Sequence, residues 1–247
     1  MTLRATTIIV TAVLCLAPVA GHAALAPYAQ DFEGLVLADV NALADDGWLV
    51  HGNVYAVPSL ALLYSYGPYP APNDGAAFCA LVSGQGGPLQ GTQQLSVFSD
   101  YNNTDHAEGY LIESLVYREQ TIALEDVGKL CVLAWDAKHG DWTSTGQTAQ
   151  VYFDVDPPGV PPGIGFPMCG IPVNLNMTCI PDTWGSYQFV FTIPPGCDGY
   201  VLRFGFASTA TSYDPTVIFY DNVKFCPEGL ATPASQPSWG ALKSLYR

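Results

Sequence analysis

The sequence predicts an all-β fold, a single antiparallel β-sandwich, and three observations lead to it. Runs of β-branched and aromatic residues recur along most of the chain, separated by Gly, Pro, Asn and Asp. Such runs are typical of short strands joined by turns. Within several of them apolar and polar residues alternate, which buries one face of a strand. Helix signals are limited to short stretches near Asp39–Asp45 and Ala123–Val127. Many short antiparallel strands of this kind form sandwiches or barrels.

The N-terminus has the pattern of a secretory signal peptide over residues 1–23. Met1–Arg4 carries one positive charge, Ile8–Val19 is an apolar run, and Gly21-His22-Ala23 is a small-x-small end suited to cleavage before Ala24. The alternative is a short membrane anchor, but the apolar run is too short to span a bilayer comfortably. We therefore expect an exported domain with no membrane span after cleavage, located outside the cell or at its surface.

The mature chain is expected to form one domain over residues 24–228. In Tyr187–Ile193 the odd-numbered residues are aromatic or aliphatic, and in Val201–Phe206 the even-numbered residues are apolar while Arg203 lies on the opposite face. The length suits one large sandwich that buries a core without needing disulfides. The expected strands are Ala29–Glu33, Trp48–Val54, Ala76–Val82, Gln93–Phe98, Tyr110–Tyr117, Lys129–Ala137, Thr148–Asp154, Tyr187–Thr192, Tyr200–Ala207 and Ile218–Phe225.

Two segments interrupt the strand pattern. Asp156–Pro181 is rich in proline, which lacks a ladder donor, so this segment is predicted to be a long loop insertion. Residues 229–247 are predicted to be a flexible tail that ends in the amphiphilic stretch Trp239–Arg247. This stretch is either a short docking or sorting signal or simply a frayed terminus.

Cysteine content favours disulfides over metal thiolates. Six cysteines remain after cleavage and no C-x-x-C pair exists, which suits an exported chain. A bond between Cys169 and Cys179 is the first expectation, because it would close the proline-rich loop. The remaining cysteines stay unassigned: Cys79, Cys131, Cys197 and Cys226.

The charge balance excludes one class of partner. Acidic residues outnumber basic ones 22 to 8, charged residues make up 12% of the chain, and the basic residues are scattered. Without a Lys/Arg patch, nucleic-acid binding is not expected. The composition suits a protein that faces neutral ligands or binds cations, and the alternative is that acidity only keeps the domain soluble.

Several segments taken together resemble bacterial secreted jelly-roll domains of the galactose-binding-like type, which include many carbohydrate-binding modules. Tyr28–Gly34 resembles the opening "FE" strand of these domains, with Gly47-Trp48 shortly after it. Gly91–Leu95 resembles their "G-x-x-x-L" strand entry, and Thr183–Tyr187 resembles the start of their "W-x-x-y-x-f-x-f" strand. Ile218–Phe225 resembles their closing "hyDNVxh" strand. Each motif is weak alone, whereas their order and spacing are more specific.

The resemblance implies a jelly roll with a structural calcium ion. In such folds the first and last strands lie side by side, and carboxylates from both meet around the ion with backbone carbonyls. The matching positions are Glu33 and Asp221, with Asp31 as a further ligand. Two carboxylates and carbonyls form a sensible part of the six to eight oxygens that calcium prefers. The alternative is that these carboxylates are solvated residues at strand ends.

Glycan binding requires exposed aromatic rings near hydrogen-bonding groups. Tyr64, Tyr66 and Tyr69 lie in a proline-rich segment that we expect to be a rigid loop. Tyr101 opens a stretch dense in Asn, Asp and His, and Trp142 lies in a polar loop. These five residues are the predicted ligand-binding set, because functional loops on a rigid sandwich are common. The alternative is that they only cover the edge of the core.

An enzyme is the rival class. The mature chain has three histidines, His51, His106 and His139, but neither a G-x-S-x-G nor an H-E-x-x-H motif. The leading hypothesis is therefore a secreted, non-catalytic, calcium-stabilised module that binds carbohydrate at or outside the cell surface. The alternatives are a polysaccharide-degrading hydrolase or lyase on the same fold, and a structural or adhesive surface protein. The sequence leaves the ligand and the oligomeric state open.

Overall fold

The computed structural model describes residues 22–75, 77–99, 103–142, 148–163, 173–211 and 216–228. Nearly all of the predicted signal peptide and the whole predicted tail 229–247 lie outside these ranges, so both remain predictions. Within the described ranges no helix has the length and apolar character needed to cross a membrane.

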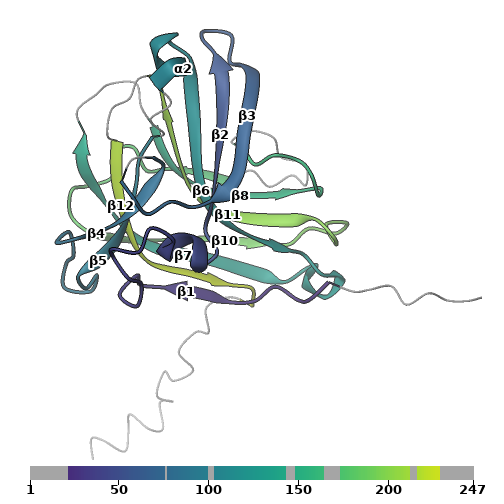
Figure 1. The fold of residues 1–247 in the computed structure, drawn as a ribbon. Helices are drawn as coiled ribbons and strands as arrows, with labels where there is room; N and C mark the ends of the chain where they lie inside the picture. Colours follow the sequence, from purple (N-terminus) through teal and green to yellow (C-terminus); the bar gives the residue numbers. More distant parts are fainter. Residues whose placement is uncertain are drawn as a thin grey trace, which may run out of the picture.

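Two antiparallel sheets form a sandwich, which confirms the predicted fold class (Figure 1). One six-stranded sheet, which we call sheet A, has the order β10-β7-β12-β5-β4, with β1 paired to β12. The other, sheet B, has the order β3-β2-β6-β11-β8-β9. The strands of sheet A are β1 (Tyr28–Gln30), β4 (Cys79–Ser83), β5 (Gln93–Val97), β7 (Leu130–Trp142), β10 (Gly185–Thr192) and β12 (Thr216–Cys226). Those of sheet B are β2 (Leu49–Ala56), β3 (Ala61–Pro70), β6 (Leu111–Thr121), β8 (Thr148–Asp156), β9 (Val173–Asn176) and β11 (Val201–Ala210).

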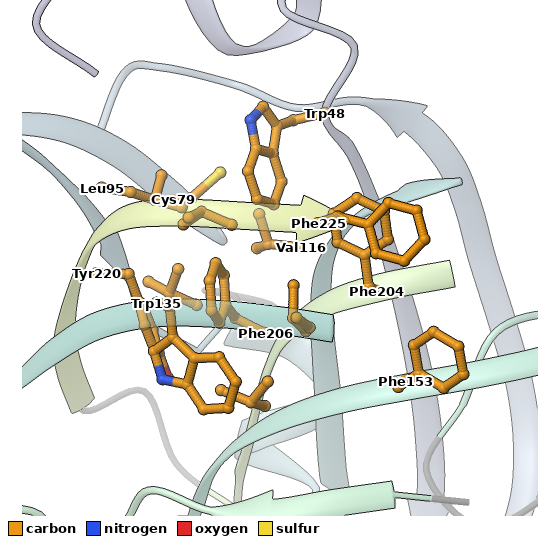
Figure 2. Packing of buried hydrophobic residues seen from close by; sticks show 14 of the residues in the cluster. Trp48, Cys79, Leu95, Val116, Trp135, Phe153, Phe204, Phe206, Tyr220 and Phe225 are labelled. Atoms are coloured by element: carbon orange, nitrogen blue, oxygen red, sulfur yellow. The ribbon is translucent and has the colours of Figure 1, made fainter. Parts of the chain in front are cut away.

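Alternating aromatic residues join the two sheets. On β11 of sheet B, Phe204 stacks on Phe225 of β12 with ring centroids 4.7 Å apart, and Phe206 stacks on Tyr220 at 3.7 Å. Trp48, at the entry to β2, stacks on Phe206 with ring centroids 5.9 Å apart (Figure 2). All five rings are almost completely buried, and each contributes about 1.5–3 kcal/mol through removal of apolar surface from water. The even-numbered face predicted for the strand beginning at Val201 is therefore the core face.

The short helices are partly as expected. α1 (Ala42–Asp45) and the 3₁₀ turn η1 (Leu124–Asp126) lie inside the two stretches with helix signals, whereas α2 (Asn103–Ala107) was not expected.

The main difference from the sequence-based expectation is β3. The tyrosine segment expected to be a loop is a ten-residue edge strand that pairs only with β2. Pro68 and Pro70 are compatible with this position because a strand at the edge of a sheet does not need every backbone N–H for a ladder. Figure 1 shows β2 and β3 running together as a long hairpin, with α2 beside its far end.

The cysteine expectation is wrong for Cys179, which is exposed and free. The segment around it is fixed by hydrogen bonds instead: β9 pairs with β8, and the Ala149 N–H donates to Thr178 Oγ1 at 3.0 Å. The expected partner, Cys169, lies outside the described residues. Cys79, Cys131 and Cys226 are also free thiols, whereas Cys197 is disulfide-bonded.

Candidate functional site

Two tyrosines of the predicted binding set are presented to solvent by β3. Tyr64 is 45% exposed and Tyr69 is 54% exposed. From residue 47 to residue 73 the chain contains no Asp, Glu, Lys or Arg. The hairpin of this otherwise acidic protein therefore adds no Asp, Glu, Lys or Arg side chain of its own to the surface that carries these exposed rings.

Tyr64 has a fixed hydroxyl. It donates a hydrogen bond to Asp105 Oδ2, and Asp105 is buried on α2. The unexpected helix thus supports an exposed tyrosine, because it holds the acceptor in place. An aromatic ring that is restrained in this way loses less entropy when it binds a ligand.

Tyr66 has a structural position instead. Its ring is packed over Gly52 on β2, where a Cβ atom would lie 2.1 Å from Tyr66 Cζ. It also meets Phe78 edge to face, with ring centroids 6.3 Å apart, and packs against the main core. The ring centroids of Tyr64 and Tyr66 are 6.1 Å apart, so the two rings are neighbours. Of the two, Tyr64 is the one that is largely open to solvent.

The other two predicted ligand residues are not placed in full. Tyr101 lies outside the described residues. Trp142 is the last residue of β7, opposite Thr216 of β12, but its side chain is outside the described part. Both stay predictions.

The opposite face of the β2–β3 hairpin lines a small apolar cavity of about 260 Å³. A register shift between Val54 and Tyr55 leaves Leu62 and Ser65 of β3 on this face. The proline-rich segment that follows β8 forms one wall of the cavity. Its lining residues are Asn53, Tyr55, Leu62, Ser65, Val160, Pro161 and Pro162.

A saturated polar network lies behind the cavity. The Asn53 amide donates to Glu113 Oε2 at 2.8 Å and to the Pro162 carbonyl at 2.9 Å. Its Oδ1 accepts from Ser65 Oγ at 2.6 Å and lies 3.2 Å from His51 Nε2. The four hydrogen-bonding positions of the amide are thereby used, and burial lowers the pKa of His51. Since Asn53 has no free position, it holds the overlying segment rather than offering bonds to a ligand.

A second buried cluster holds the same segment, Pro157–Gly163, which we call the strap. Arg203 on β11 donates to the Val160 carbonyl at 2.9 Å and pairs with Asp156 at 3.2 Å and Asp154 at 3.6 Å. Burial raises the pKa of Asp154 to about 7, because the opposing attraction of Arg203 does not compensate for desolvation. The strap therefore covers the outer face of sheet B around Asn53 and Arg203, and we expect ligand contact at the hairpin instead.

This cluster was not predicted from the sequence, although one signal for it was present. Arg203 is a single charged residue in an otherwise apolar strand, and buried charges are normally paired. The identity of its partners depends on β8 lying next to β11, which no local pattern indicates.

The expected calcium ligands are near one another, since repulsion from Asp31 and Glu33 acts on the Asp221 carboxylate, but they are not arranged as a ready metal site. Across the described residues no set of three or more His, Cys, Asp or Glu side chains is placed to hold a metal ion. Glu33 is exposed, and its carboxylate accepts bonds from the Gln93 N–H at 2.6 Å, the Thr92 N–H at 2.7 Å and the Thr92 hydroxyl at 2.7 Å. The Gln93 N–H and the Thr92 hydroxyl lower the pKa of Glu33. Glu33 thus ties the end of β1 to the start of β5, and Asp31 is exposed beside it.

Asp221 does have the character of a cation ligand. It is fully buried, its Oδ1 accepts from the Asn222 N–H at 2.6 Å, and its Oδ2 has no hydrogen-bond partner. Burial raises the pKa of Asp221 to about 7, against the opposing Asn222 N–H and with added repulsion from Asp136, Asp31 and Glu33. A buried carboxylate oxygen without a donor fits a calcium ligand.

Comparisons with known proteins give fold-level similarity only. No family model and no curated protein matches the chain. One similar solved structure is a xylan-binding domain from CBM 22, with 14% identity and a TM-score of 0.41 over 87% of this chain and 100% of that domain. Another is Caldicellulosiruptor saccharolyticus CBM27-1 in complex with mannohexaose, with 14% identity and a TM-score of 0.40 over 84% of this chain and 100% of the other. Similarity of this degree carries no argument about the ligand of the present chain.

Proposed function

We propose that this chain is an exported, non-catalytic β-sandwich module that binds neutral carbohydrate at or outside the cell surface and is stabilised by calcium. The observation that supports it best is the uncharged hairpin surface with its two exposed tyrosines, Tyr64 and Tyr69. Aromatic rings with a polar edge suit ligands that have one apolar face and many hydroxyls.

Electrostatics narrows the class of glycan. The formal net charge of −14 repels acidic polysaccharides at low ionic strength. A neutral polymer encounters no such barrier, and the hairpin itself contributes no charge. We therefore expect uncharged glycans to bind and polyuronates to bind poorly.

Export and calcium binding, the two further parts of the proposed function, are supported by the sequence and by one buried residue. Export is supported by the signal-peptide pattern of residues 1–23. Calcium is supported by the open buried oxygen of Asp221. Removing the ion with EDTA is expected to lower the melting temperature by several degrees, because a ligand that binds only the folded state stabilises it by mass action.

A glycan array combined with an assay for released reducing sugar tests the function. Binding to neutral glycans without release is the expected result. Release of sugar would instead favour a polysaccharide-degrading enzyme, and neither binding nor release would favour a structural or adhesive protein. An unchanged melting temperature in EDTA would remove calcium from the proposal.

A further inference from the structure

The apolar cavity between the β2–β3 hairpin and the strap is large for a void in a folded domain. Its volume is about 260 Å³, whereas protein interiors are close-packed and contain few voids larger than a water molecule. An apolar cavity of about 150 Å³ is enough to hold a benzene molecule. The cavity beside β3 therefore has room for one six-membered ring with a small substituent.

The hydrogen-bonding side chains in the cavity wall already have partners. Ser65 Oγ donates to Asn53 Oδ1 at 2.6 Å, and the Tyr55 hydroxyl donates to Glu113 Oε2 at 2.9 Å. The side-chain amide of Asn53 donates to Glu113 and to the Pro162 carbonyl. A sugar ring in this cavity would leave most of its hydroxyls without partners, which costs free energy. An apolar group has no hydrogen bonds to lose and avoids this cost.

The part of the strap that lines the cavity is equally saturated. Pro161 and Pro162 have no backbone N–H to donate. The Val160 N–H donates to the Pro157 carbonyl at 3.2 Å, and the Val160 carbonyl accepts from Arg203 at 2.9 Å. The strap therefore offers the cavity mainly the apolar side chains of its valine and prolines.

The charges around the cavity disfavour an anion. None of its seven lining residues is Asp, Glu, Lys or Arg. Behind Tyr55 lies the buried carboxyl group of Glu113, which accepts the tyrosine hydroxyl. Burial raises the pKa of Tyr55, and the Glu113 charge raises it further, so this hydroxyl stays protonated. A second negative charge next to Glu113 would be repelled, and the expected ligand is therefore uncharged.

The mouth of the cavity is apolar as well. Leu62 lines the cavity and is 47% exposed, so it lies where the cavity opens to solvent. The hairpin turn that precedes it adds Val57 and Leu60, which are 49% and 60% exposed. On the strap, Pro161 is also both exposed and part of the lining. An apolar group can therefore reach the cavity over an apolar rim.

We propose that this cavity is a binding site for a small neutral aromatic group. An aromatic ring is favoured over an aliphatic chain because Tyr55 contributes an aromatic ring to the wall, and pairs of aromatic rings gain more than buried area alone provides. The site differs in chemistry from the solvent-exposed rings of Tyr64 and Tyr69, which suit a ligand rich in hydroxyls. It goes beyond the proposed function and does not depend on it.

The test uses para-fluorotoluene as the probe and follows its fluorine NMR signal in the presence of the full chain. Saturable binding of about one molecule per chain is expected. Sodium benzoate and glucose, each added in tenfold excess over the probe, are expected not to displace it. Benzoate has an aromatic ring with a negative charge, and glucose is a neutral ring that needs hydrogen-bond partners, so the two compounds test charge and polarity separately.

Two variants that add side-chain volume to the lining test the location. Leu62→Trp and Val160→Phe are each expected to weaken binding of the probe at least tenfold. Leu63→Trp is the matched control, because Leu63 is also 47% exposed on β3 but lies outside the lining. Its affinity is expected to stay within twofold of wild type. Melting temperatures show whether each variant is folded.

A readout on the wild-type protein does not depend on the folding of any variant. In proton–nitrogen correlation spectra the probe is expected to shift the backbone amide signals of Leu62, Ser65 and Val160. The amide signal of Leu124, on the distant turn η1, is expected to stay unchanged.

The outcomes separate the site from the kind of ligand. The site is overturned by a lack of saturable binding, by equal affinity in wild type and both lining variants, or by an equal loss in Leu63→Trp. Displacement by benzoate or glucose would leave the cavity as a site but overturn its assignment to a neutral aromatic group. Glycan binding on the array is a separate measurement, so failure of the proposed function would not be mistaken for failure of this site.

Discussion

Replacing Arg203 with methionine tests how the strap is held. Arg203 is buried and lies 3.2 Å from Asp156, 3.6 Å from Asp154 and 3.2 Å from Glu119, and it donates to the Val160 carbonyl. Methionine retains an unbranched apolar stem but removes the charge, so two buried aspartates lose their positive partner. Breaking a buried ion pair from one side costs about 3–5 kcal/mol, and the more exposed Glu119 pair adds less than about 1 kcal/mol.

The expected loss in the free energy of unfolding is therefore about 3–5 kcal/mol at pH 8. For a domain of this size, where each kcal/mol shifts the melting temperature by about 2–4 °C, this corresponds to roughly 6–20 °C. At pH 5 the loss in the free energy of unfolding caused by Arg203→Met is expected to be about half as large. Asp154, whose pKa is raised to about 7 in the folded state, is protonated there and needs no positive partner.

Urea unfolding followed by circular dichroism at both pH values measures the change. Lys224→Met is the matched control, because Lys224 is exposed on β12. This control is expected to lower the free energy of unfolding by less than about 0.5 kcal/mol. A cost below about 1 kcal/mol for Arg203→Met at pH 8, or a cost that grows at pH 5, would refute the described role of the buried cluster.

Two further predictions concern the wild-type protein and the hairpin. Because burial raises the pKa of Asp154 and of Asp221 to about 7 from an ordinary 3.8, the stability that these two groups contribute to the metal-free protein is fully present below about pH 4. The free energy of unfolding is expected to fall by a few kcal/mol as the pH rises from about 4 to about 7. Urea titrations from pH 4 to 8 check this, and a rise in stability over that window would contradict it. Gly52→Ala is expected to destabilise by about 1–3 kcal/mol, since the new Cβ would lie 2.1 Å from the Tyr66 ring. Gly34→Ala, with nothing within 4 Å, is the control, and equal melting temperatures for the two variants would contradict the packing described for Tyr66.

Local patterns in the sequence predicted the sandwich well. Alternation in β10 and β11 identified their core faces, because side-chain direction has a period of two in any strand. β3 was not recognised, since Pro68 and Pro70 are turn signals unless the strand lies at an edge, and edge position depends on the order of strands in the sheet.

The site was predictable only in part for the same reason. Tyr64 and Tyr69 were identified by residue type, but the inward position of Tyr66 depends on the pairing of β3 with Gly52. Likewise, Asp221 was identified from the closing strand, whereas its opposition to Asp136 arises from the register of β12 and β7. Register across a sheet is set by distant parts of the chain, which a single sequence does not reveal.

The proposed function places the binding of a neutral glycan on the exposed hairpin tyrosines. The most direct measurement is calorimetric titration of the neutral oligosaccharide that gives the strongest array signal into wild type, Tyr69→Ala and the control Leu124→Ala. Leu124 is 76% exposed on η1. We predict at least tenfold weaker binding for Tyr69→Ala, a loss of about 1.4 kcal/mol, and wild-type affinity for Leu124→Ala. Equal affinity in Tyr69→Ala and wild type would show that the hairpin tyrosines do not form the glycan site.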